Sequence, residues 1–136
     1  MNSNNKVLTW TGRVLSGLVA IMMAFSASLK FMNLPDVAKQ MKELGYPAEL
    51  LLILGIIEIS CAILYAIPQT SVLGAVLLTG YLGGAVATHV RVNDNFAFPA
   101  IGGVLVWLGL FLRDWRIRAL LPIRRALPIA TEPPKP

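Results

Sequence analysis

The chain has 136 residues, which fits a single domain, and its 12 basic and seven acidic residues give a net charge of +5. Apolar residues make up 56% of the chain and charged residues 14%, against about 25% charged residues in an ordinary soluble domain. These proportions exclude a soluble or a disordered protein. The lone Cys61 excludes an internal disulfide and a paired-cysteine redox or zinc site, and the basic residues do not form the face that a nucleic-acid binder needs.

Charged residues and prolines divide the chain into four long apolar segments, and the mean hydropathy of the whole chain is +0.67. The segments are continuous rather than alternating, which favours membrane helices over barrel strands. We expect one all-α membrane domain over residues 1–136, a bundle of four transmembrane helices with a short amphipathic helix between the first two spans. The predicted spans are about 12–31, 50–67, 71–90 and 96–112.

The first span allows a second interpretation. Its basic start, apolar run and small residues Ser26–Ser28 are similar to those of a cleaved signal peptide. The apolar core of a signal peptide is about 7–15 residues long, whereas the run Val14–Leu29 has 16 residues. We therefore favour a retained membrane helix.

The segment between the first two spans predicts a short amphipathic helix over about 35–44. Val37, Met41 and Leu44 share one face, the charged residues share the other, and Gly45 and Pro47 end the helix. Such a helix is expected to lie on the outer membrane surface.

Glu58 is the most informative residue of the second span. Nine residues after Glu49, it lies roughly 13 Å deep in the membrane, where a carboxyl group is costly and normally faces the bundle interior. Gly55, Ala62 and Tyr65 share its helix face. Two interpretations remain: Glu58 binds a ligand or a proton, or it is a neutral residue whose hydrogen bond fixes helix packing.

The third span follows a tight turn, Pro68–Ser71, in which Thr70 or Ser71 is expected to cap the next helix. It is rich in glycine and alanine. Gly80 and Gly84, with Gly83 beside them, form a small-residue face that lets another helix backbone approach closely. We therefore expect the third span to be central in the bundle.

Three further polar residues complete a candidate ligand-binding set with Glu58 and Tyr65. Alternating spans bring Lys30 and His89 to the same leaflet as Glu58. Lys30 either reaches Glu58 or snorkels outward, and snorkelling is the more common behaviour of a lone lysine. His89 either lies at the interface or acts as a base beside the buried acid. Tyr81 is included in this set, although membrane tyrosines, like Tyr65, more often pack than react.

The distribution of basic residues predicts the orientation. The N-terminus, the 68–71 turn and the tail over 113–136 hold eight basic residues: Lys6, Arg13, Arg113, Arg116, Arg118, Arg124, Arg125 and Lys135. The opposite side holds four: Lys30, Lys39, Lys42 and Arg91. Both termini are therefore expected in the cytoplasm. The tail is expected to be an interfacial anchor to anionic lipid, with disorder from Thr131 onward.

Several stretches carry a resemblance that covers about residues 10–122. They are Gly45–Pro47, Gly55–Glu58, Pro68, Leu78–Arg91 and Leu112–Asp114, and the most specific is the Gly-Gly-Ala-x-x-x-His sequence of Gly83–His89. Together they resemble the DoxX-like family of small bacterial membrane proteins. The resemblance implies a four-helix protein of the inner membrane, with polar positions at Lys30, Glu58 and His89. Some relatives are associated with quinol and thiosulfate oxidation, so the resemblance allows a quinone-like ligand but implies no particular activity.

Three hypotheses follow. In the first, the chain is an accessory or binding protein whose outer-leaflet pocket around Glu58 holds a quinone-like or lipid-like molecule. In the second, it is a redox or proton-transfer subunit of a quinone-linked oxidoreductase. In the third, it is a structural membrane partner. An enzyme is the weakest because the sequence offers no nucleophile, metal set or cofactor motif. The expected partners are membrane lipid and a homo-oligomer or larger membrane complex, without nucleic acid.

Overall fold

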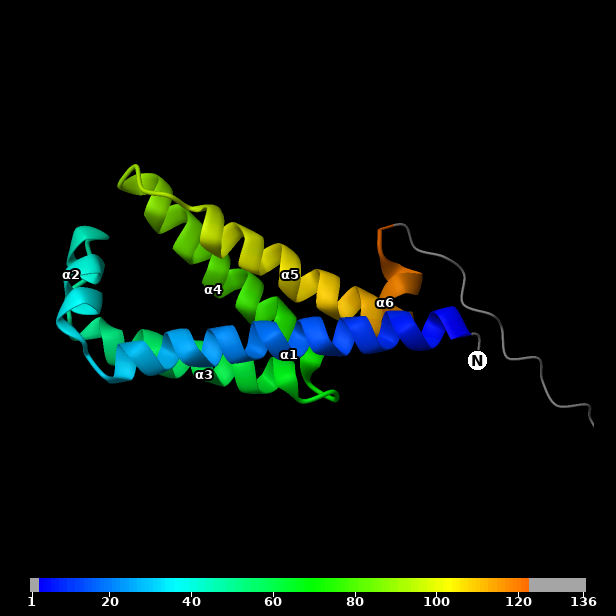
Figure 1. Cartoon of the computed structure of the whole chain (residues 1–136). Helices are drawn as coiled ribbons and strands as arrows, with labels where there is room; N and C mark the ends of the chain where they lie inside the picture. The colour runs from blue at the N-terminus through cyan, green and yellow to red at the C-terminus, as the bar shows by residue number, and fades with distance from the viewer. Residues whose placement is uncertain (1–2, 123–136) are drawn as a thin grey trace, which may run out of the picture.

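A computed structural model of the chain describes residues 3–122, which form six helices and contain no strand (Figure 1). The helices are α1 (Ser3–Phe31), α2 (Pro35–Glu43), α3 (Leu50–Ala66), α4 (Ser71–Arg91), α5 (Ala97–Arg113) and α6 (Trp115–Leu120). The all-α prediction is confirmed. The observed bounds of α2 to α5 agree with the predicted ones to within one residue at each end.

The four apolar helices form two pairs, α1 with α3 and α4 with α5 (Figure 1). α1 packs against α3 and α5, and α4 packs against the same two helices, so each helix has two principal neighbours. The two pairs diverge toward the end of the molecule where α2 lies. The expectation that the third span is central is therefore wrong, since α4 occupies one corner of a four-membered ring.

Three glycines outside the predicted small-residue face allow the closest approaches between helices. A Cβ atom on Gly12 would collide with the backbone of α5, and one on Gly74 would collide with the backbone of α3 at Tyr65. Gly109 lies against α1, where an added Cβ would come within 2.6 Å of Ser16 Oγ. By contrast, an added Cβ meets nothing within 4 Å at three glycines of α4: Gly80, Gly83 and Gly84. Within residues 3–122, that face packs against no other helix.

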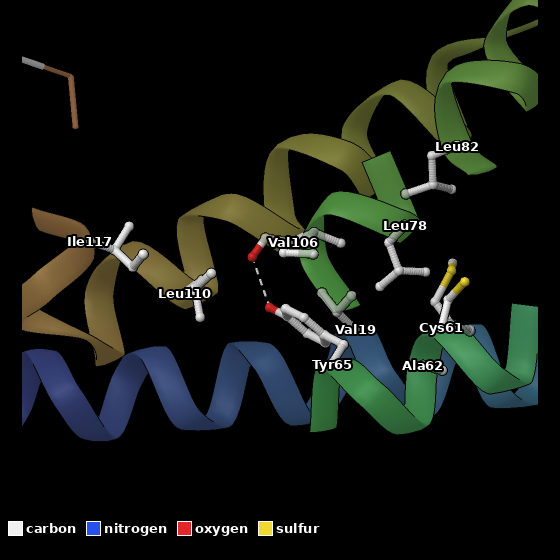
Figure 2. Close-up of a cluster of buried hydrophobic side chains, with 11 residues drawn as sticks. Val19, Cys61, Ala62, Tyr65, Leu78, Leu82, Val106, Leu110 and Ile117 are labelled. Carbon is white, nitrogen blue, oxygen red and sulfur yellow. Dashed lines mark hydrogen bonds between the residues drawn. The ribbon is translucent and has the colours of Figure 1, made fainter. Parts of the chain in front are cut away.

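The core lies between the helix pairs, where side chains from all four apolar helices meet (Figure 2). Leu78 of α4 and Val106 and Leu110 of α5 have no exposed surface. Tyr65 of α3 points toward Val106, and its hydroxyl group donates a hydrogen bond of 2.8 Å to the Val106 carbonyl oxygen. This small core holds the two pairs together.

Large apolar side chains cover much of the outer surface. On α1, the exposed fractions of Trp10, Ile21 and Phe25 are 64%, 68% and 64%. Apolar patches of this extent are uncommon on soluble monomers. By length and composition, α1 from Asn5 and α4 are long and apolar enough to cross a membrane, while α3 and α5 are apolar but shorter, with 17 residues each.

α1 begins nine residues before the predicted span. Lys6 and Arg13 limit the apolar stretch, but neither residue type ends a helix, so the helix runs on through them to Ser3. α1 contributes Val19, Met23 and Ala27 to the buried residues. α1 is thus part of the packed bundle.

Two local predictions at helix ends need revision. Neither Thr70 nor Ser71 caps α4, because their hydroxyl groups donate to the carbonyl oxygens of Leu64 and Pro68 instead. The first part of the tail, expected only as an anchor, is the helix α6, which Asp114 caps by accepting from the backbone N–H of Arg116. The rest of the tail from residue 123, with Arg124, Arg125 and the predicted disorder from Thr131, lies outside the described residues.

Candidate functional site

A cavity of about 440 Å³ lies at the end of the bundle where α2 sits. Residues from α1 to α5 line it, so it occupies the space between the two helix pairs. Its polar lining residues include Ser26, Lys30, Gln40, Tyr46, Glu58, Tyr81, Thr88 and His89. Met23, Leu29, Met41, Leu54, Leu82 and Phe98 are among the apolar residues of its wall.

Glu58 lies in the wall of this cavity and pairs with a lysine. The Lys30 ammonium nitrogen is 2.7 Å from Glu58 Oε2 and also donates to Ser26 Oγ at 2.9 Å. The Glu58 side chain is only 2% exposed and that of Lys30 15%. Lys30 therefore turns inward to the carboxylate, which settles the choice against outward snorkelling. A charge pair in this setting is stabilised by direct contact and hydrogen bonds rather than by water.

Gly55 explains how the end of α1 comes so close to Glu58. An added Cβ on Gly55 would come within 2.9 Å of the Phe31 ring and 3.4 Å of Lys30 Cβ. A larger residue at this position would force the Phe31 ring to shift. Gly55 lies one turn before Glu58 on the same buried face of α3, so the missing side chain leaves room for the end of α1 beside Glu58.

A second donor, Tyr81 of α4, also reaches Glu58. Its hydroxyl group donates to Oε2 at 3.2 Å, so the hydrogen bonds from Lys30 and Tyr81 end on the same oxygen. Oε1 accepts no hydrogen bond from the described residues. No side-chain oxygen in this part of the chain is both fully enclosed and unpartnered. Oε1 therefore borders the open space of the cavity and is free to accept a hydrogen bond there.

His89 lines the same cavity but has its own partner. Its Nδ1 lies 2.9 Å from Asp94 Oδ2 in the loop between α4 and α5. Asp94 Oδ1 accepts from the backbone N–H of Asn95 at 2.7 Å. That hydrogen bond, followed by the one with His89, lowers the pKa of the exposed Asp94 carboxyl group. With Nδ1 beside the Asp94 carboxylate, Nε2 is the ring nitrogen that has no hydrogen-bond partner among the described residues.

Tyr65 does not belong to this cavity, although it was predicted to join it. It is fully buried in the core, where its hydroxyl group lies 3.0 Å from Ser16 Oγ and bonds to Val106. It lies seven residues beyond Glu58, which is roughly 10 Å along the helix axis. Gly80 and Gly84 line the cavity as bare backbone, whereas Gly83 lines a separate apolar groove of about 650 Å³ between α4 and α5.

α2 covers the cavity, and two contacts attach its C-terminal end to α4. Tyr46 Oη lies 2.9 Å from Thr88 Oγ1, and Arg91 Nη2 donates to the Leu44 carbonyl oxygen at 2.8 Å. Gly45, at φ +83°, makes the turn between them. Three residues here, Tyr46, Thr88 and Arg91, were not among the predicted site residues. The buried face of α2, with Met41 and Leu44, was the signal that could have pointed to a covered space.

Among residues 3–122, no three His, Cys, Asp or Glu side chains come together as a metal site requires. The cavity instead combines one carboxylate, one ammonium group, two phenols and one imidazole on a mainly apolar wall. This arrangement can hold an uncharged polar group by hydrogen bonds and place an apolar body beside it.

Comparison with known protein families gives one match, to the model of the DoxX-like family over residues 14–109. The chain belongs to the DoxX-like family. Searches of curated proteins and of solved structures found no match to this DoxX-like chain. The matched range contains the whole cavity-lining set of the DoxX-like chain, from Met23 of α1 to Pro99 of α5. Family membership and the apolar helices together indicate a membrane protein.

Proposed function

We propose that the chain is a four-span protein of the bacterial inner membrane that binds a small amphipathic molecule in the cavity beneath α2. α3 and α5, with 17 residues each, are at the lower limit of about 17 residues for a membrane-spanning helix. Their outward faces carry large exposed apolar side chains, among them Leu52, Ile53 and Ile56 on α3. These features support membrane spans for all four apolar helices.

The proposed orientation places both termini in the cytoplasm and the cavity in the outer leaflet. α6 lies near the N-terminal end of α1, and α2 lies at the opposite end (Figure 1). Arg13, Arg113, Arg116 and Arg118 are therefore at one end of the bundle, away from the lysines of α2. The positive-inside rule assigns the end with more arginine and lysine to the cytoplasm.

The observation that carries the binding proposal is Glu58 Oε1 at the cavity wall, which accepts no hydrogen bond from residues 3–122. Lys30 and Tyr81 fix the carboxylate through Oε2, which leaves Oε1 as a fixed acceptor for a ligand hydroxyl or amide group. Apolar residues such as Met23, Leu82 and Phe98 surround the rest of the space. A quinol-like or lipid-like molecule, with a polar group at one end and an apolar body, fits this distribution.

The test measures which small molecule stays with the purified protein and what removes it. We expect native mass spectrometry to detect an adduct on the wild-type protein, and the Glu58→Gln, Lys30→Gln double variant to reduce its retention about tenfold, the value of one charge-assisted hydrogen bond. Removing both charges avoids an unpaired buried lysine. Glu43→Gln, at the exposed end of α2, is the matched control.

The result also separates the alternatives. A folded double variant that retains the adduct at the wild-type level would contradict the binding proposal and leave the pair a structural role in helix packing. A second candidate function, proton transfer beside a bound quinone, is favoured by the Tyr81 hydroxyl group on Glu58 and by His89 in the same cavity. A quinone as the retained molecule would support this candidate, and a phospholipid or fatty acid would support binding alone.

A further inference from the structure

A second cavity, of about 400 Å³, lies at the opposite end of the bundle from α2. The end of α5, the turn between α3 and α4, and α1 enclose it. Its lining residues are Arg13, Ser16, Gly17, Ala20, Ala66, Pro68, Ser71, Arg113 and Asp114. None of them lines the cavity around Glu58.

Two arginines give this second cavity its charge. Arg113 is fixed in place, because its Nη2 donates to the Tyr65 carbonyl oxygen at 3.0 Å and its guanidinium lies over the Tyr65 ring. Arg13 lies over the Trp10 ring, 5.6 Å from the ring centroid. Within residues 3–122, neither arginine forms a salt bridge with a carboxylate.

Asp114 is the acidic member of the lining. One of its oxygens, Oδ1, caps α6 by accepting from the Arg116 N–H. The other two polar residues, Ser16 and Ser71, are neutral, so the lining as a whole carries one net positive charge. α4 begins at Ser71, and the positive end of its helix dipole adds to the attraction for an anion.

We infer that this cavity binds the phosphodiester group of a phospholipid of the cytoplasmic leaflet. Two guanidinium groups match the geometry of a phosphate. A phosphodiester carries one negative charge, which one net positive charge balances, whereas a phosphate monoester carries about −1.5 to −2. Gly17 and Ala20 continue the lining along α1 toward the membrane interior, over roughly 10 Å from Arg13. This apolar wall suits the glycerol and the start of an acyl chain better than free phosphate.

The experiment uses the full chain in lipid nanodiscs of phosphatidylcholine with a fraction of phosphatidylglycerol, followed by native mass spectrometry of the released protein. We expect Arg13→Gln to lower the retained phosphatidylglycerol about tenfold, as expected for loss of a charge-assisted contact. Lys6→Gln removes the same charge from an exposed residue near the start of α1 that does not line the cavity. This control is expected to retain lipid at the wild-type level.

A second variant tests the cavity without changing charge. An added Cβ at Gly17 meets no atom within 4 Å, so Gly17→Leu fills the space and is expected to expel the lipid while the protein stays folded. Val14→Leu, on the exposed face of α1, is its control. Equal lipid retention in Arg13→Gln, Gly17→Leu and the wild type would overturn the inference. If inorganic phosphate displaces the bound lipid, the site would be one for a soluble anion. That result would contradict the inference that the bound phosphate group belongs to a phospholipid.

Discussion

The Lys30–Glu58 pair shows which parts of the site could be predicted from individual residues of the sequence. A carboxyl group in an apolar segment is costly without a partner, so Glu58 predicts its own burial and a nearby donor. For Lys30 the sequence allowed two outcomes, and its 2.7 Å contact with Glu58 Oε2 shows that it turns inward. The partner of His89 was not predictable, because Asp94 reaches it only through the loop geometry after α4.

Tyr65 shows the limit of reasoning from helix faces. It shares a face with Glu58, and that face is buried as predicted. Helical spacing identifies the direction of a side chain but not which neighbours it meets at its own depth. Tyr65 lies beyond the cavity, where α1 and α5 come together around Gly109, so its hydroxyl group bonds within the core.

Tyr65→Phe is expected to lower the free energy of unfolding by about 1–2 kcal/mol, because it leaves the buried Ser16 hydroxyl group and the Val106 carbonyl oxygen short of a partner. Thermal unfolding in detergent measures the change. Ligand retention in the cavity beneath α2 is expected to stay at the wild-type level. If the variant is as stable as the wild type but loses the ligand, Tyr65 would have to be counted among the ligand-binding residues.

At the scale of helices, the sequence predicted which segments are helical better than how they pack. The apolar runs set the bounds of α3, α4 and α5, and Gly45 ends α2 as expected. The packing faces were not predictable from small residues alone. Glycine is common throughout membrane helices, and only the three-dimensional arrangement separates Gly74, which touches backbone, from Gly80, which does not.

Two glycine substitutions in α4 test this difference. Gly74→Ala is expected to destabilise the protein by about 1–3 kcal/mol, because the new methyl group overlaps the backbone of α3. Gly80→Ala places the same group in open space and is expected to be neutral or to stabilise the helix by up to about 1 kcal/mol. Thermal unfolding of both variants in the same detergent gives the comparison. A destabilised Gly80→Ala protein would show instead that this face contacts a second molecule.

At the scale of the whole molecule, the two cavities lie at opposite ends of one bundle and differ in charge. The one beneath α2 has a carboxylate paired with an ammonium group, and the other has two guanidinium groups with one carboxylate. In the proposed orientation, the first faces the outer leaflet and the second faces the cytoplasmic leaflet. The orientation can therefore be tested independently of either ligand.

Single cysteines in a Cys61→Ala background test the orientation with a reagent that does not cross membranes. Lys39→Cys, on the exposed face of α2, is expected to react in intact cells once the outer membrane is permeable to the reagent. Lys6→Cys, near the start of α1, is expected to react only after lysis. The opposite labelling pattern would reverse the orientation and move the cavity of Glu58 to the cytoplasmic leaflet.

The unequal lengths of the helices have a consequence for the surrounding bilayer. α3 and α5, at 17 residues, extend about 26 Å, which is about 4 Å less than the typical hydrocarbon thickness. α1, at 29 residues, extends about 44 Å. We therefore expect hydrophobic mismatch on two opposite sides of the protein, where lipids beside α3 and beside α5 compress while those along α1 do not. Such an uneven annulus favours short-chain or unsaturated acyl chains against the short helices.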